Sequence, residues 1–153
     1  MQQYNFQYCP KIIVLSKDRT TVLLCKRKGE ADYDGVFSFP GGKMETTDQS
    51  IVEGIQREKN EELGEQFKIS LLQIFSLNIL FRKKDGNAMI VPHYIAFHQG
   101  GEISLSQEEY SEYKWVTITE LDAFGPKIEN IPEMVRQVLR LAEISSEKDF
   151  GVI

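Results

Sequence analysis

Two apolar segments near the start of the chain constrain its fold more than any other feature. Residues 8–16 are apolar and rich in β-branched side chains, and residues 21–26 are apolar again after the polar break Lys17-Asp18-Arg19. Two such runs around a short polar turn predict a β-hairpin. Because polar residues hardly interrupt either run, both faces of the predicted sheet are covered, as in a sheet that lies between helices.

A third strand and a helix are predicted next. Residues 36–39 form a short apolar strand, and residues 49–63 have the pattern of a helix that ends at Gly64. Asp48 and Ser50 are both suitable N-cap residues for this helix.

One face of the predicted helix is apolar. At 100° per residue, Val52, Ile55 and Leu63 form a stripe, and the stem of Lys59 lies along it. This face is expected to pack on the sheet. Gly54 has no helix-propensity reason to be inside the helix, so it predicts the close approach of another backbone.

The following segment predicts a second hairpin. Residues 68–82 form one long strand or a broken pair, and the turn Asp85-Gly86 returns the chain along residues 88–98. Pro92 within the returning strand predicts an edge position or a bulge.

The last elements complete an order that mixes strands and helices. A polar loop of residues 99–111 leads to a short strand at 113–116, a short helix from Thr119 and a helix at 132–147. The order β-β-β-α-β-β-β-α-α predicts an α/β (α+β) fold with a mixed β-sheet sandwiched between α-helices. The length predicts a single domain over residues 1–153.

The overall charge limits the expected partners. The chain has 18 Lys and Arg against 23 Asp and Glu, a net charge of -5, which disfavours a nucleic-acid polymer. No apolar run reaches membrane-spanning length, so no membrane partner is expected. Cys9 and Cys25 lie in or beside apolar segments and are expected to be reduced. With no secretory signal visible, this predicts a cytoplasmic protein. The expected oligomeric state is a monomer or a homodimer.

Residues 57–64, Arg-Glu-Lys-Asn-Glu-Glu-Leu-Gly, carry the clearest chemical signal. Glu58, Glu61 and Glu62 are spaced i, i+3 and i+4, which brings them onto one helix face. Three like charges on one face repel one another unless cations lie beside them. Upstream, residues 39–43, Phe-Pro-Gly-Gly-Lys, predict a tight glycine turn. A glycine turn before an acidic helix favours a site for divalent metal and phosphate.

This pattern resembles the Nudix box of Nudix hydrolases, written G-x5-E-x7-R-E-U-x-E-E-x-G-U, where U is a bulky aliphatic residue. The residues that carry the resemblance are Gly42, Arg57, Glu58, Glu61, Glu62 and Gly64. The element order also resembles the Nudix fold over nearly the whole chain.

The upstream half of the box departs from the family pattern by one residue. Alignment from Gly42 places Asp48 at the first glutamate of the box, whereas alignment back from Arg57 places Gln49 there. We expect the extra residue to enlarge the loop at residues 45–48.

The resemblance implies hydrolysis of the pyrophosphate linkage of a nucleoside diphosphate derivative, such as a nucleoside triphosphate, a nucleotide sugar or an ADP-ribose type compound. Mg²⁺ or Mn²⁺ would activate the phosphorus that water attacks. The implied metal ligands are Glu58, Glu61 and Glu62, with a backbone carbonyl at Gly41 or Gly42. The alternative is a solvated salt-bridged helix face.

The resemblance also implies catalytic and positioning roles. Arg57 is expected to orient the site and to pair with Glu61. The general base is open between the box residues Glu61 and Glu62 and the later acidic loop, where Glu108 and Glu109 are favoured.

Substrate contacts are expected on both sides of the glycine turn. Arg27, Lys43 and the turn Gly41-Gly42 are candidate phosphate contacts, with a plain solvated side chain as the alternative for each cation.

Some aromatic residues and histidines have two possible roles. Phe37, Phe81 and Tyr94 are candidates for stacking a base or for the core. His93 and His98 are expected on opposite faces of their strand, with structural or substrate-lining roles. The alternative function is a Nudix-fold nucleotide-sensing binding module without hydrolytic activity.

Overall fold

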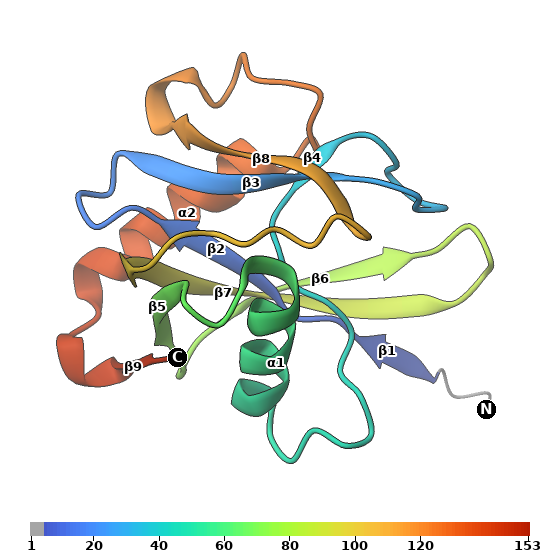
Figure 1. Cartoon of the computed structure of the whole chain (residues 1–153), viewed down its shortest axis with the longest axis horizontal. Helices are drawn as coiled ribbons and strands as arrows, with labels where there is room; N and C mark the ends of the chain where they lie inside the picture. Colours follow the sequence, from blue (N-terminus) through green and yellow to red (C-terminus); the bar gives the residue numbers. More distant parts are fainter. Residues whose placement is uncertain (1–4) are drawn as a thin grey trace.

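The computed structural model describes residues 5–153, which form nine strands and two α-helices (Figure 1). The strands are β1 (Phe6–Tyr8), β2 (Lys11–Leu15), β3 (Thr21–Arg27), β4 (Phe37–Ser38), β5 (Lys68–Leu72), β6 (Leu77–Arg82), β7 (Ala88–Gly100), β8 (Tyr110–Thr117) and β9 (Phe150–Val152). The α-helices are α1 (Ile51–Leu63) and α2 (Ile131–Ile144), and the 3-10 turns are η1 (Ile118–Glu120) and η2 (Glu147–Asp149). Within this part of the chain, no helix combines the length and the hydropathy needed to cross a bilayer.

All nine described strands join one mixed sheet around β7. The order is β4-β3-β2-β7-β5-β9, while β1 and β6 also pair with β7, and β8 pairs with β3. The strands β1 and β2 run parallel to β7, and β5 and β6 run antiparallel to it. This arrangement confirms the predicted mixed sheet.

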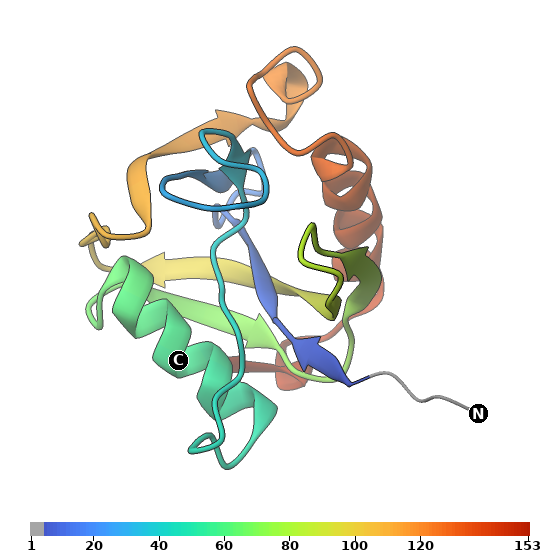
Figure 2. The ribbon, with the colours of Figure 1, turned by 90° about the vertical axis from the view of Figure 1, so that its right-hand side faces the viewer.

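The two α-helices pack on opposite faces of the sheet (Figure 2). Neighbouring residues of β2 point to opposite faces, so Ile12 is buried in the core beneath α1 and Ile13 in the core beneath α2. Ile55 of α1 and Val135 of α2 are buried in these two cores. The near-continuous hydrophobicity of the first hairpin therefore did indicate a sheet covered on both faces.

The central strand corrects one expectation about Pro92. This residue is not on an edge strand, because β7 has paired strands on both sides. On one side β1 pairs with residues 88–90 and β2 with residues 93–97, so Pro92 lies where the partner changes. The chain segment Cys9-Pro10 joins those two partners, and both cysteines of the protein are buried free thiols.

The segment at residues 68–82 is a broken pair of strands, β5 and β6, and both pair with β7. The prediction that the last helix continues to residue 147 was wrong, because α2 ends at Ile144 and η2 follows. The final strand β9 then pairs with β5, an element that the sequence patterns did not indicate. Pairing of so short a strand depends on its neighbour more than on its own residues.

The helix α1 begins after Ser50, whose side chain accepts a hydrogen bond from the Glu53 N–H at 3.1 Å. Ser50 rather than Asp48 is therefore the N-cap. On the sheet side, Ile55 and Leu63 are buried as predicted, and Lys59 is fully buried. The Lys59 ammonium donates to the Phe67 carbonyl at 2.8 Å.

Candidate active site

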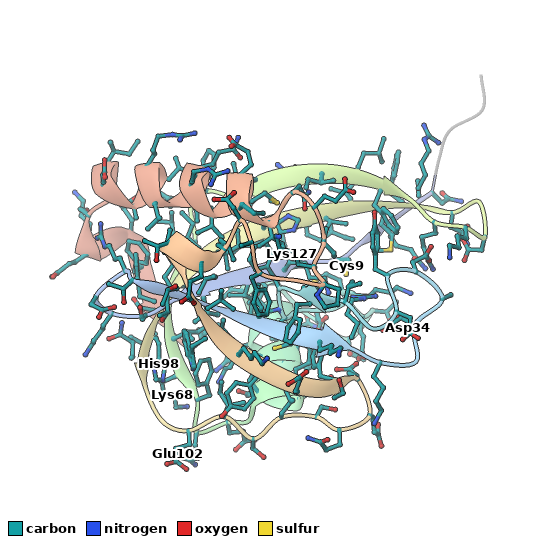
Figure 3. All side chains as sticks on the ribbon, turned by 90° about the horizontal axis from the view of Figure 1, so that it is seen from above. Cys9, Asp34, Lys68, His98, Glu102 and Lys127 are labelled. Carbon is teal, nitrogen blue, oxygen red and sulfur yellow. The ribbon has the colours of Figure 1, made fainter. Side chains whose placement is uncertain are left out.

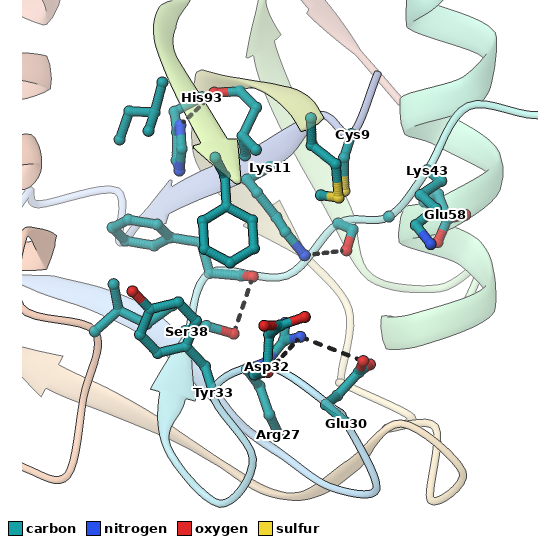
Figure 4. A pocket seen from close by; sticks show the side chains of 18 of the residues that line it. Cys9, Lys11, Arg27, Glu30, Asp32, Tyr33, Ser38, Lys43, Glu58 and His93 are labelled. Carbon is teal, nitrogen blue, oxygen red and sulfur yellow. Dashed lines mark hydrogen bonds and ion pairs between the residues drawn. The ribbon is translucent and has the colours of Figure 1, made fainter. Parts of the chain in front are cut away.

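A cavity of about 700 Å³ lies beside the N-terminal part of β2 (Figure 4). Acidic side chains and the glycine turn line one part of it: Gly41, Gly42, Glu58, Glu62 and Glu109. Apolar side chains line another part: Phe39, Ile79, Phe81, Met89 and Val91. Basic side chains also reach its wall: Lys11, Arg27, Lys43 and Lys83.

The glycine turn comes to this place because β2 and β3 diverge. Within the described chain, β2 and β3 pair at Leu15 and Val22, close to the turn that joins them. At the other end of β2, the segment after β4 lies beside the strand. The Ile12 N–H donates to the Pro40 carbonyl at 2.8 Å. At Gly41, φ is +129°, and an added Cβ would lie 2.3 Å from the Pro10 carbonyl oxygen. Only glycine fits this crossing.

Glu62 is held by donors from two separate segments. Its Oε2 accepts hydrogen bonds from the Gly41 N–H at 2.7 Å and from the Tyr110 hydroxyl at 3.1 Å. Its side chain is almost fully buried. Burial raises the pKa of Glu62 well above its usual range, while the nearby Lys11 ammonium and the Gly41 hydrogen bond lower it.

Glu58 lies one turn earlier in α1, against the glycine turn. Its Oε1 accepts a hydrogen bond from the Arg57 guanidinium at 2.8 Å. Burial raises the pKa of Glu58, and Arg57 opposes that rise. An added Cβ on Gly42 would lie 2.3 Å from Glu58 Oε2. The missing side chain of Gly42 therefore leaves room for this carboxylate.

Arg57 is anchored mainly by Asp48 in the enlarged loop. Arg57 Nε donates to Asp48 Oδ1 at 2.8 Å, and a terminal nitrogen donates to Oδ2 at 2.9 Å. This pair holds the pKa of Asp48 down, to about 2. Gln49, the other alignment candidate, is exposed and donates its amide to the Thr47 carbonyl. Of the two alignment candidates, Asp48 is thus the one that the lengthened loop presents to the helix, and Glu45 of the same loop also pairs with Arg57 at 3.5 Å.

Gly54 is explained by the same loop, and the expected contact with another backbone was wrong. An added Cβ on Gly54 would lie 2.3 Å from the Met44 sulfur and 2.9 Å from Asp48 Oδ2. Two side chains of the loop, rather than a backbone, approach the helix at this point.

Glu61 differs from its two neighbours in the acidic helix. It pairs with Arg57 at 3.4 Å as expected, but its side chain is 57% exposed and is not part of the cavity wall. Across residues 5–153, no three side chains of His, Cys, Asp or Glu are grouped as a ready-made metal site. The structure thus brings Glu58 and Glu62 to the cavity, and the three-carboxylate ligand set stays a prediction.

The acidic loop after β7 contributes one residue to the cavity. Glu109 lines the wall, and its charge raises the pKa of both Glu58 and Glu62. Glu108 is exposed and is not among the lining residues. Glu102 follows the end of β7, where Gly100 pairs with Lys68, and it lies well away from Cys9 in the cavity wall (Figure 3).

The predicted phosphate contacts all reach the cavity wall. The Arg27 guanidinium already has two partners within the protein, because it forms an ion pair with Glu30 at 3.4 Å and donates to the Asp32 carbonyl. Lys43 is exposed, and its own carbonyl accepts a hydrogen bond from Arg57 at 3.1 Å.

Two site residues were missed from the sequence. Lys11 donates to the Gly41 carbonyl at 2.6 Å, and Tyr110 holds Glu62. The available signal for Lys11 was a charged residue at the start of a buried strand. For Tyr110 it was an aromatic residue directly after the acidic pair Glu108-Glu109.

Of the aromatic and histidine candidates, some line the cavity and the others pack in the interior of the protein. Phe81 lines the cavity, whereas Phe37 and Tyr94 belong to the cores beneath α2 and α1. His93 lines the cavity, and burial lowers its pKa to about 4. His98 stacks on Phe67 with ring centroids 4.7 Å apart, so the two histidines do lie on opposite faces.

The protein is thus a mixed sheet between two helices, with a glycine turn and an acidic helix in the wall of one cavity. A sequence comparison matches residues 10–138 to the NUDIX domain. The chain therefore belongs to the Nudix hydrolase family.

Several solved structures are similar to this chain over most of their length. The MutT protein from Methanosarcina mazei Go1 has a TM-score of 0.71 at 18% identity, covering 94% of this chain and 99% of that one. The NUDIX domain of Shewanella oneidensis NrtR, solved with ADP ribose, has a TM-score of 0.70 at 17% identity, with coverages of 92% and 90%. A C. elegans Ap4A hydrolase has a TM-score of 0.71 at 15% identity, with coverages of 90% and 98%. At these identities the likeness establishes the fold.

Proposed function

We propose that this protein hydrolyses the pyrophosphate linkage of a nucleoside diphosphate derivative with the help of Mg²⁺ or Mn²⁺. The observation that carries the proposal is the composition of the cavity, where Glu58, Glu62 and Glu109 lie in the same wall as apolar side chains. Phosphates suit the acidic part once metal is present, and a base suits the apolar part. The volume of about 700 Å³ is within the usual range for small-molecule sites.

The residues fit a hard divalent cation. Glu58 and Glu62 offer carboxylate oxygens of the kind that Mg²⁺ and Mn²⁺ prefer, and their mutual repulsion would be relieved by a cation. The space beside Gly42, which a Cβ would fill, keeps the Glu58 carboxylate accessible. When bound, the metal supplies charge neutralisation at the phosphates and lowers the pKa of water.

The chain's own residues divide the remaining work. Glu109 is the candidate that accepts the proton of the attacking water, because it reaches the same wall as Glu58 and Glu62. The water oxygen then bonds to phosphorus as the bridging P–O bond breaks, which gives a monophosphate and the phosphorylated remainder. Arg57 orients Glu58, and Arg27 and Lys43 contact phosphate oxygens.

The test is metal-dependent turnover of a substrate panel by the wild type and by Glu58→Gln and Glu62→Gln. The panel contains nucleoside triphosphates (including oxidised ones), nucleotide sugars, ADP-ribose, dinucleoside polyphosphates and NADH. Each variant is expected to lose at least about a hundredfold in kcat. Glu65→Gln, at an exposed acid just beyond α1, is the matched control. Unchanged turnover in both site variants would refute the assignment.

A second candidate function is a nucleotide-sensing binding module without hydrolysis. The similar NUDIX domain of NrtR was solved with ADP ribose, so the fold accommodates such a ligand. Tight binding of one panel member with no product formed at saturating Mg²⁺ and Mn²⁺ would favour this alternative.

A further inference from the structure

Gly41 is held on both sides by charged side chains, through the two peptide groups that flank its Cα. Its N–H donates to Glu62 Oε2 at 2.7 Å, and its carbonyl accepts a hydrogen bond from the Lys11 ammonium at 2.6 Å. The close crossing of Gly41 over Pro10 prevents this residue from shifting easily. Lys11 and Glu62 are therefore held close together by the two adjacent peptide groups that meet at Gly41.

Lys11 differs from Arg27 and Lys83, two other cations of the cavity wall. Arg27 and Lys83 form ion pairs with Glu30 and Asp85. The Lys11 side chain instead extends from β2 into the cavity and ends at a neutral carbonyl (Figure 4). Its positive charge therefore remains available to the acidic wall.

The Gly41 carbonyl is a hard oxygen beside two carboxylates, which also makes it a suitable ligand for a divalent cation. A carbonyl oxygen has two lone pairs, but an ammonium group and a divalent cation on the same oxygen repel each other, so each weakens the binding of the other there. The Lys11 ammonium at 2.6 Å takes up this oxygen. Lys11 and metal therefore compete for the same place in the site.

We propose that Lys11 is an internal cation of this site. It occupies the Gly41 carbonyl and partly balances Glu62 until a divalent ion arrives with the substrate phosphates, and it then pairs with a phosphate oxygen. Lys11 thus weakens metal binding to the empty site and strengthens binding of the phosphates. The inference rests on the proposed function, because it requires metal at Glu58 and Glu62.

The decisive experiment is titration of Mn²⁺ into the purified protein without substrate, followed by electron paramagnetic resonance of the free ion. Lys11→Met is expected to lower the Kd for Mn²⁺ about tenfold and to raise KM for the substrate, a combination that mere disruption would not give. Lys11→Gln keeps a hydrogen-bond donor without the charge, and it is expected to change both quantities in the same directions. Lys17→Met, at an exposed lysine after the other end of β2, is the control for net charge.

The possible results distinguish a failure of the metal site from a failure of the role of Lys11. A wild type whose Mn²⁺ binding is absent or unaffected by Glu62→Gln would overturn the proposed metal site and this inference together. A wild type that binds Mn²⁺ through Glu62, with unchanged or weaker binding in Lys11→Met and Lys11→Gln, would overturn the role of Lys11 alone. Tighter Mn²⁺ binding in both Lys11 variants, with Lys17→Met unchanged, supports it.

Discussion

Replacement of His93 should make the free energy of unfolding depend less on pH between pH 7 and pH 4. The His93 ring lies in the cavity wall, 7% exposed, and its Nδ1 lies 3.0 Å from the Val91 carbonyl oxygen and 3.3 Å from that of Leu77. Burial favours the neutral ring and lowers its pKa from 6.5 to about 4. As the pH falls, His93 is therefore protonated at a higher pH in the unfolded chain than in the folded protein.

The sign and the size follow from linkage. Between about pH 6.5 and pH 4 the unfolded state binds more protons at this residue, so the free energy of unfolding decreases as the pH falls. A difference of that size corresponds to a loss of about 2 kcal/mol by pH 5 and about 3 kcal/mol by pH 4, relative to pH 7. Below about pH 4 the contribution of His93 is constant.

The assay is urea unfolding of the wild type and of His93→Gln at pH 7, 6, 5 and 4. With an m-value of about 2 kcal/mol per molar, the wild type should lose about 1 M more in its midpoint than the variant between pH 7 and pH 5. His98→Gln is the matched control and should keep the steep acid limb, because His93 is still present. Parallel profiles for the wild type and His93→Gln would refute the reasoning.

Two further predictions concern the geometry around Glu58. Asp48→Asn should reduce kcat at least about tenfold, because Arg57 loses its two-point ion pair with the loop. The control is Gln49→Ala at the neighbouring exposed position, which should leave steady-state kinetics unchanged. Gly42→Ala should weaken Mn²⁺ binding and turnover, because the added Cβ meets Glu58 Oε2 at 2.3 Å; Gly100→Ala, where a Cβ meets no atom within 4 Å, is its control. Wild-type values in Asp48→Asn or Gly42→Ala would contradict these contacts.

The parts of the fold that local patterns encode were predictable. The first hairpin, α1 and the burial of both sheet faces follow from apolar periodicity and from residues such as Gly64 at the helix end. The choice between Asp48 and Gln49 was not predictable, because it depends on how a loop with one extra residue closes. In the structure, the Asp48 carboxylate lies close enough to accept a hydrogen bond from Arg57, and this contact identifies Asp48 as the site residue.

The remaining site residues come together through long-range pairing. Lys11 and Tyr110 are far apart in sequence. They meet the site because β2 begins beside the glycine turn and β8 begins where Tyr110 reaches Glu62. Neither residue belongs to a local motif, so only the register of the sheet brings them to Gly41 and Glu62. The environment of Pro92 was mispredicted for the same reason, since the second partner of β7 is set by distant segments.

The division of β7 between two sets of partners bears on how substrate range changes in such a protein. Its first half pairs with β6, and these two strands supply Phe81, Met89 and other apolar residues of the cavity wall. Its second half pairs with β2 and β5 in the main core. The turn of this hairpin at residues 83–87 is exposed or half-buried, so the turn is free to lengthen or change composition. The strand β6 is more constrained, because Leu77 and Ile79 also pack against the core beneath α2. Substitutions at this turn are thus expected to change which ligand the cavity admits while the acidic wall of Glu58 and Glu62 stays unchanged.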